Sequence, residues 1–72
     1  MITNRKLQEY NFESMEEYFD YIDESIINGQ RSQAKNLILA LSKEQRIKAY
    51  NYFNDTFHGF FTETKQIIIN NL

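Results

Sequence analysis

The chain has 72 residues, a formal net charge of −2 and 42% hydrophobic residues, and it contains neither cysteine nor proline. A chain of this length is sufficient for one small domain, so we expect residues 1–72 to form a single helical domain. The absence of cysteine excludes disulfide bonds and thiolate metal sites. The longest apolar run covers residues 37–41, too short to span a membrane, and no apolar signal-peptide segment follows the first residues. We therefore expect a cytoplasmic protein without a membrane partner.

The first predicted helix covers residues 14–28. Ser14 and Glu17 have the spacing of a capping box, in which a serine begins the helix and a glutamate follows three residues later. Asn28 and Gly29 both tolerate the left-handed conformation that ends a helix. Spacings of four, three and four place four apolar side chains on one face of this helix: Met15, Phe19, Ile22 and Ile26.

Two further helices are predicted, over residues 31–41 and 43–70. The helix over residues 31–41 has an apolar face, but Leu39 lies on its opposite side, so a second face is either buried or meets a partner. The helix over residues 43–70 begins at another capping box, Ser42 to Gln45. Its apolar stripe keeps the helical period past Gly59, which favours one continuous helix, with a break at that glycine and a fourth helix as the alternative.

The fold class predicted by these elements is all-α: a small three-helix bundle with a long C-terminal helix, or a four-helix bundle if the chain breaks at Gly59. Residues 1–11 are expected to form either a short helical turn or an extended arm against the bundle. Eight side chains are predicted to be buried together: Phe19, Ile22, Ile26, Leu37, Leu41, Tyr50, Phe53 and Phe57.

Charge is unevenly distributed along the chain. Residues 1–30 contain seven acidic and two basic residues, a net charge of −5, whereas residues 31–72 contain three acidic and six basic residues, a net charge of +3. Six of the acids follow one side of the first helix, where like charges three or four residues apart repel one another. This side is either a solvated surface, a surface paired with bases inside the fold, or a docking surface for a basic protein. The predicted protein-binding residues are Glu13, Glu16, Glu17, Asp20, Asp23 and Glu24.

Two other functions are considered beside protein binding. Helices 31–41 and 43–70 carry a basic set that could contact phosphates, although nucleic acid is the less favoured partner because the net charge is negative. Self-association is the second alternative, through the aromatic C-terminal helix or through apolar residues that lie off the core faces. The basic set comprises Arg31, Lys35, Lys43, Arg46 and Lys48, and the off-core apolar residues are Tyr21, Leu39, Tyr52 and Ile69.

No catalytic, cofactor-binding or metal-binding motif is visible. The chain has no cysteine nucleophile, no glycine-rich phosphate loop and a single histidine, His58. Asp55 and His58 are three residues apart and could lie on one helix face, but two ligands do not make a metal site. We expect a protein that is not an enzyme and that has no cofactor.

Residues 28–35, followed by residues 41–45, resemble segments of small uncharacterised all-helical proteins of phages and mobile elements. This resemblance implies an accessory protein that binds a host or defence protein and modulates or inhibits it, as anti-CRISPR proteins do. Taken together with the acidic side of the first predicted helix, it gives the expected partner as a host or defence protein with a basic surface. The resemblance carries over no active site.

Overall fold

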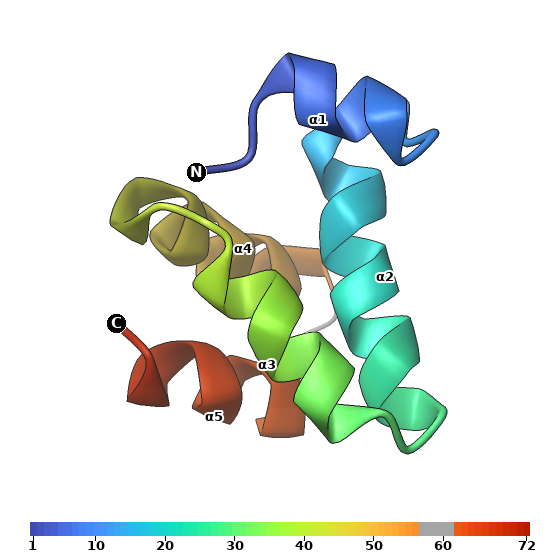
Figure 1. Cartoon of the computed structure of the whole chain (residues 1–72). Helices are drawn as coiled ribbons and strands as arrows, with labels where there is room; N and C mark the ends of the chain where they lie inside the picture. Colours follow the sequence, from blue (N-terminus) through green and yellow to red (C-terminus); the bar gives the residue numbers. More distant parts are fainter. Residues whose placement is uncertain (57–61) are drawn as a thin grey trace.

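The computed structural model describes residues 1–56 and 62–72, and the regular structure in these two ranges is entirely helical (Figure 1). The all-α class is therefore confirmed for this part of the chain. The described helices are α1 (Asn4–Glu9), α2 (Met15–Ile27), α3 (Arg31–Leu39), α4 (Lys43–Thr56) and α5 (Thr62–Asn70). The first eleven residues, left open by the sequence, contain the short helix α1.

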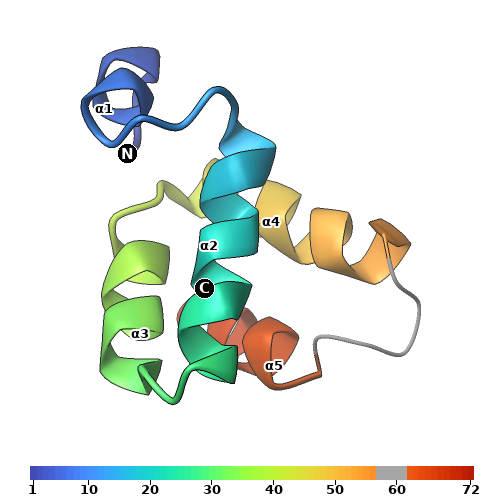
Figure 2. The same cartoon turned by 90° about the vertical axis from the view of Figure 1, so that its right-hand side faces the viewer.

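The predicted continuous helix over residues 43–70 is wrong. Helices α4 and α5 pack against each other, and Lys65 Nζ lies 3.3 Å from Asn54 Oδ1. In one unbroken helix these residues, eleven positions apart, would be separated by about 16 Å along the axis. Figure 2 shows α4 and α5 as two helices in different directions. Gly59, the predicted position of a break, lies outside the described residues.

The size of the domain explains this difference. An unbroken helix from residue 43 to residue 70 would be about 42 Å long. The longest extent of the structure is 31 Å, so about a quarter of such a helix would project beyond the other helices. Folding α5 back buries Thr64 and Ile68 in the same core as Phe53. Each of the two helices presents apolar residues to that core, so an unbroken apolar period in the sequence does not require one continuous helix.

The ends of the first two helices have defined caps. Ser14 Oγ accepts a hydrogen bond from the Glu17 N–H, as the capping box predicts. At the C-terminus of α2, Gly29 has φ 78°, and the N–H of Gln30 donates to Ser25 O over 2.7 Å. These are the features of a Schellman motif, so the predicted stop at residues 28 and 29 is confirmed. Asn11, with φ 63°, follows α1 in the same manner.

The second capping box is formed in both directions. Gln45 N–H donates to Ser42 Oγ over 3.2 Å, and Ser42 N–H donates to Gln45 Oε1 over 3.0 Å. The same Gln45 amide also accepts from the N–H of Ile2 and donates to its carbonyl. This glutamine therefore begins α4 and holds the N-terminal segment against it.

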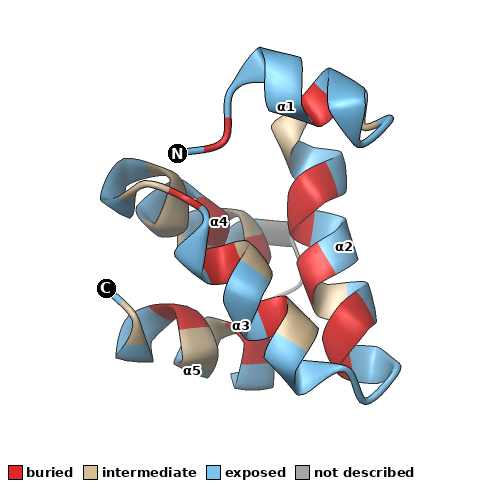
Figure 3. Cartoon of the chain, in the orientation of Figure 1, coloured by how far each residue is buried: buried red, intermediate tan, exposed pale blue. Residues whose placement is uncertain are grey.

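Helices α2 and α3 form an antiparallel pair, and α1 lies across the N-terminal end of α2 (Figures 1 and 2). Helices α4 and α5 pack against each other and against α2. Figure 3 shows buried positions recurring along α2 on the side toward the other helices. Among the predicted core residues, Leu37 and Tyr50 are half-buried, and Phe57 lies outside the described residues. Five others are buried as predicted: Phe19, Ile22, Ile26, Leu41 and Phe53.

Within residues 1–56 and 62–72, no helix is both long enough and apolar enough to cross a membrane.

The core also includes residues that the sequence did not single out. Tyr18 is completely buried, and Ile2 and Leu7 bring the N-terminal segment into the core. Leu39 is 48% exposed, so α3 is not enclosed on a second face.

Candidate functional site

The six predicted protein-binding residues, which we name the acidic face, lie along α2 and the residue before its cap. Five of them are exposed and Asp23 is half-buried. Helix α2 contains no basic residue, and Ile27, which is 75% exposed, lies among the carboxylates on the same side. The buried side of the helix, with Phe19 and Ile22, faces away from them. The fold therefore presents the acidic face outward.

Three of these carboxylates accept hydrogen bonds from neutral groups. Glu17 Oε2 accepts from the N–H of Glu13 over 2.6 Å, and Asp20 Oδ1 accepts from Tyr52 Oη–H over 2.8 Å. The pKa of the Tyr52 hydroxyl is raised to about 12. Burial is the larger cause of this rise, and the hydrogen bond to Asp20 is the next. A neutral donor leaves the negative charge of its acceptor uncompensated. Internal bonding positions these side chains without neutralising them.

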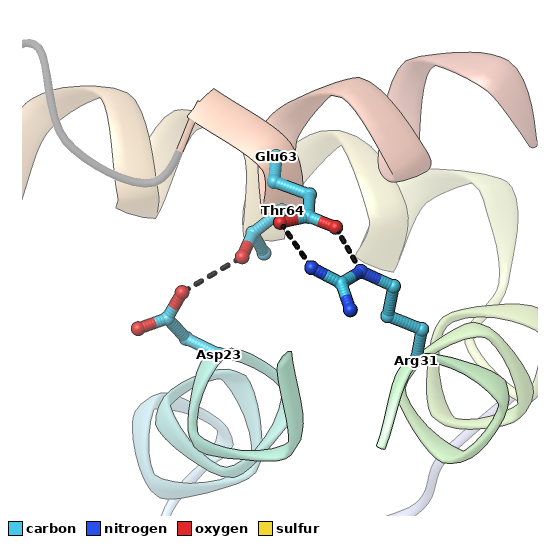
Figure 4. A network of polar contacts seen from close by, with 4 residues as sticks. All are labelled: Asp23, Arg31, Glu63 and Thr64. Atoms are coloured by element: carbon cyan, nitrogen blue, oxygen red, sulfur yellow. Dashed lines mark hydrogen bonds and ion pairs between the residues drawn. The ribbon is translucent and has the colours of Figure 1, made fainter. Parts of the chain in front are cut away.

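Asp23 joins α2 to α5 through the third of these bonds (Figure 4). Its Oδ1 accepts from Thr64 Oγ1–H over 2.7 Å. The neighbouring Glu63 binds Arg31 of α3 in two places, one of them between Nη2 and Oε2 at 3.2 Å. This pair lowers the pKa of the Glu63 carboxyl, chiefly through the hydrogen bond from Arg31. Both side chains are exposed, so the pair adds little stability.

The basic set does not neutralise the acidic face through ion pairs. Between residues of the two described ranges, ion pairs within 4 Å join Lys6 to Glu9 and Arg31 to Glu63. Arg46 instead donates to two backbone carbonyls, Leu41 O after α3 and Asn71 O after α5. A cation at these helix ends opposes the negative end of each helix dipole. Both arginines proposed for nucleic-acid binding therefore have partners inside the fold.

An aromatic pocket of about 470 Å³ opens between α1, α2 and α3. The ring centroids of Phe12 and Tyr21 are 5.6 Å apart, and those of Tyr10 and Phe12 are 6.3 Å apart. Gln33 Nε2 donates to Tyr21 Oη over 2.9 Å and to Ser25 Oγ over 3.0 Å. The sequence marks Tyr21 as lying off the core, and the structure makes it one wall of this pocket. Its lining residues are Tyr10, Phe12, Tyr21, Gln33 and Leu37.

The sequence does not predict this pocket because two of its walls belong to the segment left open between a turn and an arm. Tyr10 ends α1 and Phe12 lies beyond the left-handed Asn11, so their rings converge through a turn rather than through helical spacing. The pairing of α2 with α3 then brings Gln33 opposite Tyr21. The sequence signal for this pocket is one aromatic residue on each side of an asparagine, Tyr10 and Phe12 around Asn11.

A second pocket, of about 530 Å³, lies between α2 and α4. Glu16 and Lys48 both line it, and so does the ring of Tyr52. Tyr52, which the sequence places off the core, is half-buried and packs on Phe19 at a centroid distance of 5.5 Å. This pocket is lined by opposite charges and by a tyrosine already bound to Asp20. It is therefore less suited than the aromatic pocket to a charged ligand.

The described residues contain no group of three histidine, cysteine, aspartate or glutamate side chains that could hold a metal ion. The predicted pair of Asp55 and His58 is not tested, because His58 lies outside the described residues.

Comparison of the chain with protein-family models, curated proteins and solved structures finds no match. The fold and the site therefore define a small all-α domain with an acidic face and an adjoining aromatic pocket.

Proposed function

We propose that this protein is a non-catalytic protein-interaction module that uses the acidic face to dock on a basic surface of a larger protein. The observation that carries the proposal is the uncompensated charge of α2. Six carboxylates lie on or beside one helix, and no ion pair within the described ranges includes any of them. Neighbouring like charges on a helix cost a few tenths of a kcal/mol each, a cost that a basic partner would reverse.

The resemblance of residues 28–35 and 41–45 to small phage and mobile-element proteins supports a particular role. We infer an accessory protein that occupies a surface of a host or defence protein and so modulates or inhibits it. Occupying a surface needs no catalytic group, only charge and shape complementarity over an area of ordinary interface size.

The proposal is tested by reversing charge where it does not serve the fold. Glu17 and Asp20 are unsuitable, because their carboxylates bind Glu13 N–H and Tyr52 Oη–H. The side chains of Glu13 and Glu24 are exposed and form no such bond among the described residues. The variant Glu13→Lys with Glu24→Lys therefore changes the acidic face and leaves these contacts in place.

A matched control carries the same change of net charge on another helix. Glu44→Lys with Asp55→Lys reverses two exposed acids of α4, also eleven positions apart. Tagged proteins are incubated with a lysate of the cells from which the gene comes, at low and high salt, and captured proteins are quantified by mass spectrometry. We expect the acidic-face variant to lose a basic partner that the wild type and the control retain, and high salt to weaken capture.

Equal capture by the acidic-face variant and the wild type would refute the acidic face as the docking surface. Thermal melting of both variants, followed by circular dichroism, establishes that each one is folded. Tight and salt-sensitive binding of duplex DNA by the wild type would favour the nucleic-acid alternative instead.

A further inference from the structure

We propose that the aromatic pocket is the site where one arginine side chain of the basic partner inserts. This inference rests on the proposed docking function and names the group that the site would recognise. The pocket adjoins the acidic face, because Tyr21 lies on α2 between Glu17 and Glu24, four residues after the first and three before the second. Residues at these spacings are neighbours on a helix surface.

The rings of the pocket are suited to a cation. Tyr10 is 50% exposed and Tyr21 is 37% exposed, so both present aromatic surface that the fold itself does not cover. A cation over an aromatic face is attracted by the negative charge density of the ring. The three rings of Tyr10, Phe12 and Tyr21 form one cluster, so a single side chain can contact more than one of them.

The charge around the pocket selects a cation rather than an apolar group. Glu17 carboxylate accepts from the backbone N–H of Glu13, the residue that follows Phe12, and is thus fixed beside the pocket wall. Among the bases near the lining residues in sequence, Lys6 pairs with Glu9 and Arg31 with Glu63. Lys35 is two residues from both Gln33 and Leu37, about 200° around the axis of α3, so helical spacing places it on the side of α3 away from the pocket. A partner's positive charge would therefore enter a negative environment.

The polar groups of the pocket favour arginine over lysine. Both N–H groups of the Gln33 amide are used, one for Tyr21 Oη and one for Ser25 Oγ. Its carbonyl oxygen remains an acceptor directed by those two bonds. A guanidinium group can stack on a ring and still donate in its own plane, whereas an ammonium group is a point charge without a stacking face.

The experiment titrates the purified protein with N-acetyl-arginine methylamide and follows the ring protons of Tyr10 and Tyr21 by NMR. Two matched compounds are the citrulline derivative, which keeps the planar shape without charge, and the norleucine derivative, which keeps only the apolar chain. We expect saturable shifts with the arginine compound that are half-complete near about 30 mM, the dissociation constant that corresponds to about 2 kcal/mol from one desolvated cation–π contact. The arginine side-chain protons should shift upfield from ring currents.

Two variants locate the binding. Tyr10→Leu keeps an apolar side chain but removes a ring, and it should weaken binding about fivefold. Glu17→Gln keeps an acceptor for Glu13 N–H while removing the charge, and it should weaken binding about twofold. The remote change Glu44→Gln should have no effect.

Equal binding of the norleucine or citrulline compound, or no saturable shift of either tyrosine, would overturn the arginine pocket. This result is separate from the test of the docking surface, because the titration needs no partner protein. If arginine binds but the Glu13→Lys, Glu24→Lys variant still captures its partner, the pocket stands and the acidic docking face fails. If capture is lost but arginine does not bind, the docking face stands and the pocket fails.

Discussion

The hydroxyl of Tyr18 should contribute measurably to stability, because it caps a helix from inside the core. Tyr18 is completely buried, and its hydroxyl donates to Leu37 O over 2.7 Å. Leu37 lies in the last turn of α3, where carbonyls lack donors from their own helix. Leu41 N–H, the donor that a continued helix would supply, binds Ile38 O instead. The tyrosine hydroxyl therefore satisfies a carbonyl that would otherwise be left without a donor.

Tyr18→Phe removes this donor without removing the ring, so the change leaves no cavity of ring size. The bond is part-buried, so losing its donor costs about 1 kcal/mol, rising to about 3 kcal/mol where no water replaces the hydroxyl. In a domain this small, each kcal/mol lowers the melting temperature by about 4–8 °C. Urea denaturation followed by circular dichroism measures the loss as a lower midpoint with an unchanged slope.

Tyr50→Phe is the matched control, because Tyr50 is half-buried and its hydroxyl forms no hydrogen bond among the described residues. Its midpoint should change by less than the equivalent of about 0.5 kcal/mol. Equal midpoints for the Tyr18 variant and the wild type would refute the capping role. Equal losses in both variants would show that a tyrosine hydroxyl matters here for another reason.

Three further predictions concern the core, the helix ends and alkaline pH. Phe53 is fully buried, so Phe53→Ala should cost about 3–5 kcal/mol and abolish a cooperative melt; an unchanged melting temperature would contradict its place in the core. Arg46→Ala should cost about 1–3 kcal/mol in urea denaturation, because it removes charged donors from two carbonyls, whereas exposed Arg31→Ala should lower the urea midpoint by less than Arg46→Ala does. Burial raises the pKa of the Tyr18 and Tyr52 hydroxyls to about 12, against about 10 in the unfolded chain, so the unfolded state loses these protons first. Their contribution is complete below pH 10 and is lost as pH rises to 12, a decline in urea midpoint that Tyr18→Phe should reduce.

The helices that have local cap sequences could be predicted well. Ser14 and Ser42 begin helices as their capping boxes indicate, and Gly29 ends α2. The division of the C-terminal half into α4 and α5 could not be predicted from the period of its apolar stripe. That period describes which side of a helix is buried, and two helices packed on one core can share it. The choice between one continuous helix and two packed helices depends on the length of the domain, which is a property of the tertiary structure.

The candidate site also has a part that could be predicted from local sequence and a part that could not. The acidic face follows from helical spacing on α2, and the structure places its carboxylates on the outer side. The internal bonds of Asp20 and Asp23 could not be predicted, because their donors, Tyr52 and Thr64, are 32 and 41 residues away in the chain. The aromatic pocket likewise depends on Gln33 of α3 meeting Tyr21 of α2. Contacts distant in sequence have no local pattern from which they could be inferred.

Added salt gives a final test of whether the negative half of the chain is compensated. Residues 1–30 carry a net charge of −5 and residues 31–72 a net charge of +3, but no ion pair between described residues joins the acidic face to the basic set. If repulsion within the acidic face dominates, raising NaCl to about 0.5 M should raise the melting temperature, since screening acts within about 10 Å at 0.1 M salt and more strongly above it. The rise should be smaller in the Glu13→Lys, Glu24→Lys variant, where two of the repelling charges are replaced, and unchanged in the Glu44→Lys, Asp55→Lys control. A melting temperature that falls with salt would mean that attraction between the two halves stabilises the fold, and the acidic face would then lack the uncompensated charge on which docking depends.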